Sequence, residues 1–204
     1  MCRNEGKNIV ICGVGGQGIV LFGKILGEFY KRKGCELKIS DIVGLGQRGG
    51  SVICHFRYSE QPIHSPLIKA GDVDFLISFE QTETLRNMHY MQDNGVIFTS
   101  TFELSSPSVN ADIEKDIVGD KTLIIKEAWD KTYILDAAEY GDLGVDLNLM
   151  SNIVMLGLFA SYMGYDDLEL IDVMKENINP NFIDSNIKAF ELGKQIFEGQ
   201  RALH

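Results

Sequence analysis

Three glycines near the start of the chain have the spacing of a phosphate-binding loop. Gly13, Gly15 and Gly18 form a G-x-G-x-x-G pattern. In such a loop the first glycine permits a tight turn, the second lets the backbone approach a phosphate, and the third lets a helix pack closely on a strand. Because the N–H groups at the start of a helix attract anions, the pattern predicts a phosphate-bearing ligand or cofactor.

Two further residues of this loop depart from the simple pattern. Gly16 adds a fourth glycine, and Gln17 places a long polar side chain directly before Gly18. Together they leave the loop open to a close neighbour, which is either a ligand or another protein. The alternative is a glycine loop that only packs against something else.

A second glycine-rich loop, GLGQRGGSV, covers residues 44–52. It follows the second expected strand, so it should lie at the same carboxyl edge of the sheet as the first loop, where open α/β sheets collect their ligands. Its candidate binding residues are Gln47, Arg48, Gly49 and Gly50. The Arg48 guanidinium could bind a phosphate or carboxylate through two hydrogen bonds, or it could form a salt bridge across a subunit boundary.

Other reactive residue types are scattered along the chain. Asp41 stands where a dinucleotide site would carry its ribose-binding acid, but it could equally begin the turn into Gly44. His55 falls inside an expected strand and is interpreted as structural. No nucleophile elbow, histidine pair with ligand spacing or carboxylate pair stands out. The sequence therefore predicts a ligand-binding site at one edge of the sheet and no catalytic residue.

The elements that must position these loops follow from hydrophobic periodicity. We expect strands at 8–12, 36–40, 51–58, 72–80, 94–100 and 121–126, and helices at 16–32, 81–91, 131–140, 148–163, 166–177 and 182–199. Residues 105–120 are polar and are interpreted as a surface excursion.

The order of these elements predicts an α/β fold with a mixed sheet. The first strand–helix–strand unit should give a parallel pair, whereas the link before residue 51 is too short for a crossover and makes the next strand antiparallel. We expect a single domain over 1–204, with the sheet core in 1–128 and a helical C-terminal third in 129–204.

Composition narrows the possible partners. The net charge of −10 argues against nucleic acid, because phosphate neutralisation needs clustered basic residues. No apolar run approaches the length of a membrane helix. The cysteines at 2, 12, 35 and 54 fit neither a zinc site nor an iron–sulfur cluster, so we assign no metal to the chain and expect a reducing, cytoplasmic location.

The two glycine loops, together with DVDFLISFEQTETLR at 72–86, resemble a known family. The sequence is similar to the gamma-type subunits of 2-oxoacid:ferredoxin oxidoreductases, and within them to the beta subunit of indolepyruvate:ferredoxin oxidoreductase. The form QRGGSV in the second loop favours this group. The resemblance covers nearly the whole chain, but residues 112–131 match nothing in it.

The resemblance implies a function. Such complexes oxidatively decarboxylate a 2-oxoacid to an acyl-coenzyme A and reduce ferredoxin. Thiamine diphosphate, Mg and iron–sulfur clusters are expected on a larger partner subunit. The gamma-type domain has a modified, three-layer Rossmann-like fold associated with coenzyme A access. By motif position, the loop residues Gly13, Gly15, Gly16, Gln17, Gly18, Gln47, Arg48, Gly49 and Gly50 are its cofactor-binding candidates.

We therefore expect an accessory subunit of an oxidoreductase, inactive alone, with an indolepyruvate or aryl pyruvate substrate favoured by resemblance only. Two alternatives stay open: a stand-alone NAD-dependent dehydrogenase, and a module that only packs a partner. Without its partner the chain is expected to form a homodimer through the glycine-loop edge or through the apolar helix around Met155.

Overall fold

The computed structural model describes residues 6–44, 50–102, 120–136 and 147–202. Its strands are β1 (Lys7–Val14), β2 (Glu36–Val43), β3 (Ser51–Ser59), β4 (Val73–Ser78), β5 (Met91–Ser100) and β6 (Thr132–Leu135). Its helices are α1 (Ile19–Arg32), α2 (Gln81–Asn87), α4 (Lys121–Ala128), α6 (Leu147–Met163), α7 (Asp167–Asn177) and α8 (Ile183–Arg201), with short 3-10 turns η1 (Met88–Tyr90) and η2 (Pro180–Phe182).

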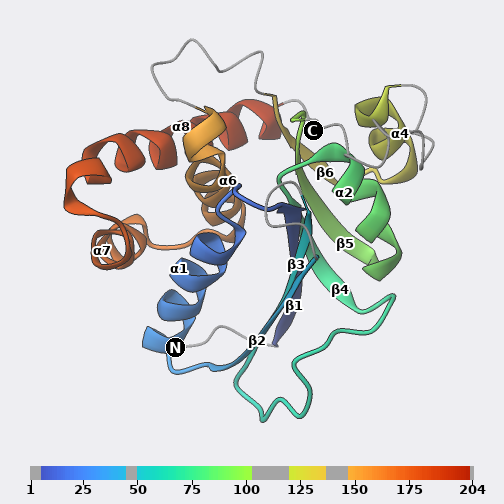
Figure 1. The fold of residues 1–204 in the computed structure, drawn as a ribbon, viewed down its shortest axis with the longest axis horizontal. Helices are drawn as coiled ribbons and strands as arrows, with labels where there is room; N and C mark the ends of the chain where they lie inside the picture. The colour runs from blue at the N-terminus through green and yellow to red at the C-terminus, as the bar shows by residue number, and fades with distance from the viewer. Residues whose placement is uncertain (1–5, 45–49, 103–119, 137–146, 203–204) are drawn as a thin grey trace.

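The six strands form one sheet with helices on both faces (Figure 1). Side chains alternate between the faces of a strand, so β1 sends Ile9 and Ile11 into the larger core beneath α1, α6 and α8, and Val10 and Cys12 into a smaller core on the side of α2 and α4. The expected three-layer α/β fold is confirmed.

The order of the strands is β2-β3-β1-β4-β5-β6. As expected from the short link, β3 is antiparallel to β2, but it is also antiparallel to β1 and lies between them. The expectation that the first two strands pair directly is therefore wrong, although they run in the same direction. The remaining neighbours are parallel, and the second strand–helix–strand unit predicts this for β4 and β5.

Two expected elements have the wrong type. Residues 121–126 were expected as a strand but form α4, in which the Asp120 carboxylate caps the helix by accepting from the N–H of Leu123 at 3.1 Å. Residues 131–140 were expected as a helix, but Thr132–Leu135 is strand β6, paired with β5. Long-range pairing overrides the local pattern in this short segment. The expected excursion at 105–120 falls almost entirely outside the described residues.

The C-terminal helices agree closely with expectation, and two of them cross at very short range. A Cβ added to Gly157 of α6 would overlap the carbonyl oxygen of Phe190, and one added to Gly193 of α8 would overlap that of Val154. Met155 is completely buried inside the chain, so it is not exposed for a contact with a second copy. The expected homodimer stays a prediction.

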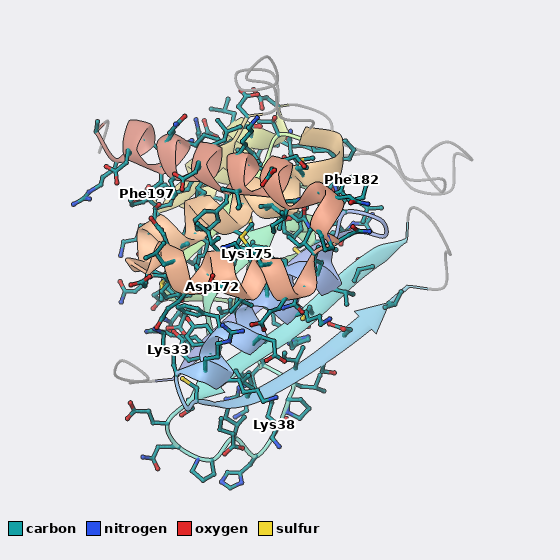
Figure 2. All side chains as sticks on the ribbon, turned by 90° about the vertical axis from the view of Figure 1, so that its left-hand side faces the viewer. Lys33, Lys38, Asp172, Lys175, Phe182 and Phe197 are labelled. Carbon is teal, nitrogen blue, oxygen red and sulfur yellow. The ribbon has the colours of Figure 1, made fainter. Side chains whose placement is uncertain are left out.

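Among the described residues, the two edge strands of the sheet differ in whether a side chain bonds their backbone. At the β6 edge, the Gln200 side chain of α8 bonds both the N–H and the carbonyl of Ile134. At the other edge, β2 is the outermost strand, and Figure 2 labels Lys38, a residue of this strand. Unpaired edge backbone favours association with another chain, so β2 is the edge available to a partner.

The state of the cysteines and the character of the helices bear on two expectations: a reducing compartment and the absence of a membrane span. Cys12 and Cys54 are buried and free, as expected of small apolar residues, whereas Cys35 is disulfide-bonded, which the expectation of a reducing compartment did not include. Among the described helices, none has both the length and the apolar character needed to cross a membrane.

Candidate functional site: the paired glycine loops

The two glycine loops meet at the carboxyl edge of β1. The N–H of Gly15 in the first loop donates to the carbonyl of Gly50 in the second at 2.9 Å. Beside it, Gly44 donates to the carbonyl of Ser51 at 2.9 Å and closes the base of the second loop. The prediction that both loops share one edge is confirmed for their described ends. The Gly15 N–H is thereby occupied by protein rather than left for a phosphate.

The Gln17 side chain closes the first loop from inside. Its Oε1 accepts from the N–H of Val14 at 2.7 Å, and its Nε2 donates to the carbonyl of Phe79 at 2.9 Å. A Cβ on Gly13 would lie 2.6 Å from that Oε1. Gly13 is therefore required by Gln17, and the loop is fixed to the end of β4 by a side chain.

The other loop glycines serve backbone conformation. Gly16 and Gly18 have φ values of 104° and 77°, in the region that side chains disfavour. A Cβ on Gly18 would overlap the amide nitrogen of Asn152 in α6, whereas one on Gly16 would meet nothing within 4 Å. Gly18 is thus packed beneath α6, and Gly16 is the exposed point of the loop.

The start of α1 carries no compensating charge. Gly18 caps it without a side-chain hydrogen bond, and its first turn contains no acidic residue. The N–H groups of such a helix start present partial positive charge. This end, next to Gly16, is the part of the edge that suits an anion.

Three candidate residues of the second loop, Gln47, Arg48 and Gly49, lie outside the described residues. Of that set only Gly50 is described, and it bonds Gly15. The ligand or interface role of Arg48 stays a prediction.

Sequence reasoning missed two buried carboxylates at this edge. Glu80 is 1% exposed and Glu83 is 5% exposed. Glu80 caps α2 by accepting from the N–H of Glu83 at 2.8 Å, and Glu83 accepts from the Ser51 hydroxyl at 2.6 Å. The signal was present as a glutamate pair spaced i, i+3 directly after a strand, a helix-start pattern. Their bonds anchor β3 and the second loop to α2.

The Cys12 thiol lies beneath the same cluster and donates to the carbonyl of Glu83. Burial raises the pKa of Cys12 to about 12. A thiol with this pKa is protonated at neutral pH and is a poor nucleophile. Cys12 thus acts as a packing residue.

The position of Asp41 does not suit ribose binding. Asp41 is exposed on β2 and pairs in register with Cys54 of β3. Since β3 separates β2 from β1, this acid lies two strand spacings, roughly 10 Å, from the strand that carries the first loop. A dinucleotide site needs the acid on the adjacent strand. The inserted strand removes that geometry.

The described part of this edge joins the two glycine loops to each other and to α2. Within residues 6–44, 50–102, 120–136 and 147–202, no group of three or more His, Cys, Asp or Glu side chains could hold a metal ion. The described polar groups of both loops are largely used to fix one loop to the other and to α2.

Comparison with known proteins decides the family. Residues 8–196 match the family model described as pyruvate ferredoxin/flavodoxin oxidoreductase. The chain belongs to this family. By family, it is a subunit of a 2-oxoacid:ferredoxin oxidoreductase.

Curated relatives of this oxidoreductase subunit cover nearly its whole length. It is 31% identical to the indolepyruvate oxidoreductase subunit IorB of Methanothermobacter thermautotrophicus, over 91% of this chain and 95% of that protein. It is 29% identical to the IorB subunit of Thermococcus kodakarensis, over 91% and 93%. A 2-oxoglutarate synthase subunit KorC of M. thermautotrophicus is 24% identical, over 96% and 97%. The resemblance inferred from the two loops is confirmed.

Solved structures confirm the fold of the oxidoreductase subunit. The gamma subunit of a keto/oxoacid ferredoxin oxidoreductase from Geobacter sulfurreducens has a TM-score of 0.67 at 20% identity, over 95% of this chain and 99% of that one. The 2-oxoglutarate:ferredoxin oxidoreductase of Magnetococcus marinus has a TM-score of 0.70 at 15% identity, over 97% of this chain but 32% of that one.

Proposed function

We propose that this chain is the accessory, non-catalytic subunit of a thiamine-diphosphate-dependent indolepyruvate or aryl pyruvate:ferredoxin oxidoreductase. The complex would convert the 2-oxoacid to an acyl-coenzyme A and pass electrons to ferredoxin. The observation that carries the accessory role is the joining of the two glycine loops, Gly15 to Gly50, at an edge whose described part holds no catalytic set. The IorB relatives support the substrate.

The glycine-loop edge is proposed as the wall that faces the larger subunit. Thiamine diphosphate would supply the decarboxylation chemistry there, with Mg and the iron–sulfur clusters on that same partner. Among the described residues of this chain, no group of three or more His, Cys, Asp or Glu side chains could hold a metal ion. The uncapped start of α1 beside Gly16 is the feature of this chain that fits a phosphate of coenzyme A.

Apolar side chains at this edge support a protein neighbour. Val43, at the end of β2, is 63% exposed, Ile42 beside it is 48% exposed, and Val20 in the first turn of α1 is 58% exposed. Register connects Val43 through Val52 of β3 to Gly13, so these residues share one end of the sheet. Exposed apolar residues next to an unpaired strand suit a partner subunit.

The test is co-expression with a larger subunit that carries a thiamine motif and iron–sulfur cysteines. The chain alone should show no turnover, and the pair should reduce a viologen dye in the presence of both indolepyruvate and coenzyme A. Turnover by the chain alone would contradict the accessory role. Tight NAD(H) binding by the pure chain would favour the dehydrogenase instead.

A charged substitution at Val43 tests separately whether the glycine-loop edge binds the larger subunit. Val43→Glu should weaken the complex at least about tenfold, because a buried unpaired charge is costly in an interface. Leu168→Glu is the matched control, since Leu168 is 75% exposed on α7, away from the loops. Equal weakening by both variants would mean that the edge has no special role. Val43→Glu should also reduce the homodimer that we propose for the isolated chain.

A further inference from the structure

A pocket lies at the end of the sheet opposite the glycine loops. It is formed by the start of β1, the end of β3 and the connection from Glu60 to Asp72, and it has a volume of about 590 Å³. Register places Lys7 against Tyr58 here and Val14 against Ser51 at the loop end. Seven residues of strand span roughly 23 Å, so this pocket is separate from the glycine-loop edge.

Arg57 is fixed in the wall of this pocket with one nitrogen left over. Its Nε donates to Oδ1 of Asn8 at 2.8 Å, and its Nη1 donates to the carbonyl of Ser65 at 2.8 Å. Its Nη2 makes no hydrogen bond with any residue that the structure describes. Because Nε and Nη1 are in use, the guanidinium is held in one orientation and can offer a ligand a single free arm.

The connection that forms the other wall is equally well held. Ile63 and Ile68 are buried, and the N–H of Ile68 donates to Nδ1 of His55 at 3.2 Å. Asn8 adds a bond from its side-chain amide to the carbonyl of Asp72 at 2.9 Å. A pocket whose walls are fixed before binding loses less entropy when a ligand arrives.

The charged residues that line this pocket are mostly basic, although the chain as a whole is acidic. The chain carries −10, yet this pocket is lined by two cations, Arg57 and Lys69, and by one carboxylate, Asp72. Within the described part of the chain, neither Arg57 nor Lys69 lies within ion-pair distance of a carboxylate. Two cations without an ion pair among the described residues, in one cavity of ligand size, favour the binding of an anion.

We propose that this pocket binds a small phosphate ester. A carboxylate is best held by two parallel bonds from one guanidinium, which Arg57 cannot supply with one free arm. A phosphate has three terminal oxygens and can accept separately from Arg57 Nη2, Lys69 and His64. The exposed side chain of Leu67 and the ring of Pro62 provide an apolar wall for the ester group.

The test uses the full chain and two anionic probes that share a phenyl ring, phenyl phosphate and benzoate, with binding followed by amide NMR shifts. Phenyl phosphate should bind saturably, shift the amides of residues 57–69, and bind at least about fivefold more tightly than benzoate. Lys69→Gln should weaken it about threefold to fivefold, whereas Lys126→Gln, an equal charge change on α4 outside the pocket, should not.

Three results would overturn this site: no saturable shift, equal binding of benzoate, or equal weakening by Lys126→Gln. The last would show attraction to general surface charge. Since the assay needs neither a partner subunit nor turnover, its failure leaves the proposed oxidoreductase function untouched.

Discussion

The amide of Gln17 joins the first glycine loop to the carbonyl of Phe79, at the end of β4 and 62 positions further along the chain. Through its other atom the same side chain accepts from the N–H of Val14. One glutamine thus satisfies a backbone donor of the first loop, the Val14 N–H, and a backbone acceptor at the end of β4, the Phe79 carbonyl. The Val14 N–H is therefore already bonded within the protein.

Replacing Gln17 should destabilise the fold. Gln17→Ala leaves the Val14 N–H and the Phe79 carbonyl without their partner, and we expect the free energy of unfolding to fall by about 1–2 kcal/mol. Urea denaturation measures the change. Gln61→Ala, on an exposed residue, should stay within about 0.5 kcal/mol of the parent protein. If the two variants are equally stable, the Gln17 bonds contribute nothing.

Gly16 and Gly18 should respond differently to alanine. Both have positive φ, which costs a side chain about 1–2 kcal/mol. Gly18→Ala additionally forces a Cβ into Asn152, so it should be the more destabilising of the two. Asn152→Ala in the same chain should recover that additional loss, as a double-mutant cycle would show. Additive effects of Gly18→Ala and Asn152→Ala would contradict the contact.

Two glycines of α8 should respond oppositely to alanine: one substitution should lower the stability of the protein and the other should raise it. Gly193→Ala places a Cβ against the carbonyl of Val154 and should cost about 3 kcal/mol or more, because the α6–α8 crossing must open. Gly199→Ala meets nothing within 4 Å and should stabilise the helix by up to about 1 kcal/mol. Thermal unfolding of the two variants distinguishes them. A stable Gly193→Ala protein would mean that the two helices are not in this contact.

Because His55 is buried, the free energy of unfolding should fall as the pH is lowered. Burial lowers the pKa of His55 below its ordinary value of 6.5, so below about pH 6.5 the unfolded chain binds a proton that the native chain does not. Stability therefore rises with pH in this range, with a limiting slope of about 1.4 kcal/mol per pH unit. His55→Asn retains an acceptor for the N–H of Ile68 and should reduce the slope between pH 6.5 and 5.5. An unchanged slope would assign it to other groups.

Much of the fold could be predicted because its signals are local. Helices α1, α6, α7 and α8 follow from apolar periodicity, and Gly34 and Pro180 mark breaks that the chain respects. The type of residues 121–135 was predicted wrongly for two reasons. Asp120 caps the helix at 121–128, a local signal that the sequence reading missed, whereas pairing with β5, a distant contact, makes Thr132–Leu135 a strand.

The residues of the candidate site likewise divide into those that the sequence predicts and those that it does not. Gly13, Gly15 and Gly18 could be found from their spacing, because a tight loop between strand and helix restricts residue type. Glu80 and Glu83 could not, because an i, i+3 acid pair on a short helix is ordinary until tertiary structure buries it against Ser51.

The sequence by itself determined that two glycine loops end strands at one edge of an α/β sheet, and it pointed to the correct family. Only the tertiary structure decided how the loops are joined there. The insertion of β3 between β1 and β2 moves Asp41 away from the first loop, the Gly15–Gly50 bond joins the two loops, and the Gln17–Phe79 bond fixes the first loop to the end of β4. Strand order and the partners of backbone groups depend on long-range pairing, which residue spacing does not encode.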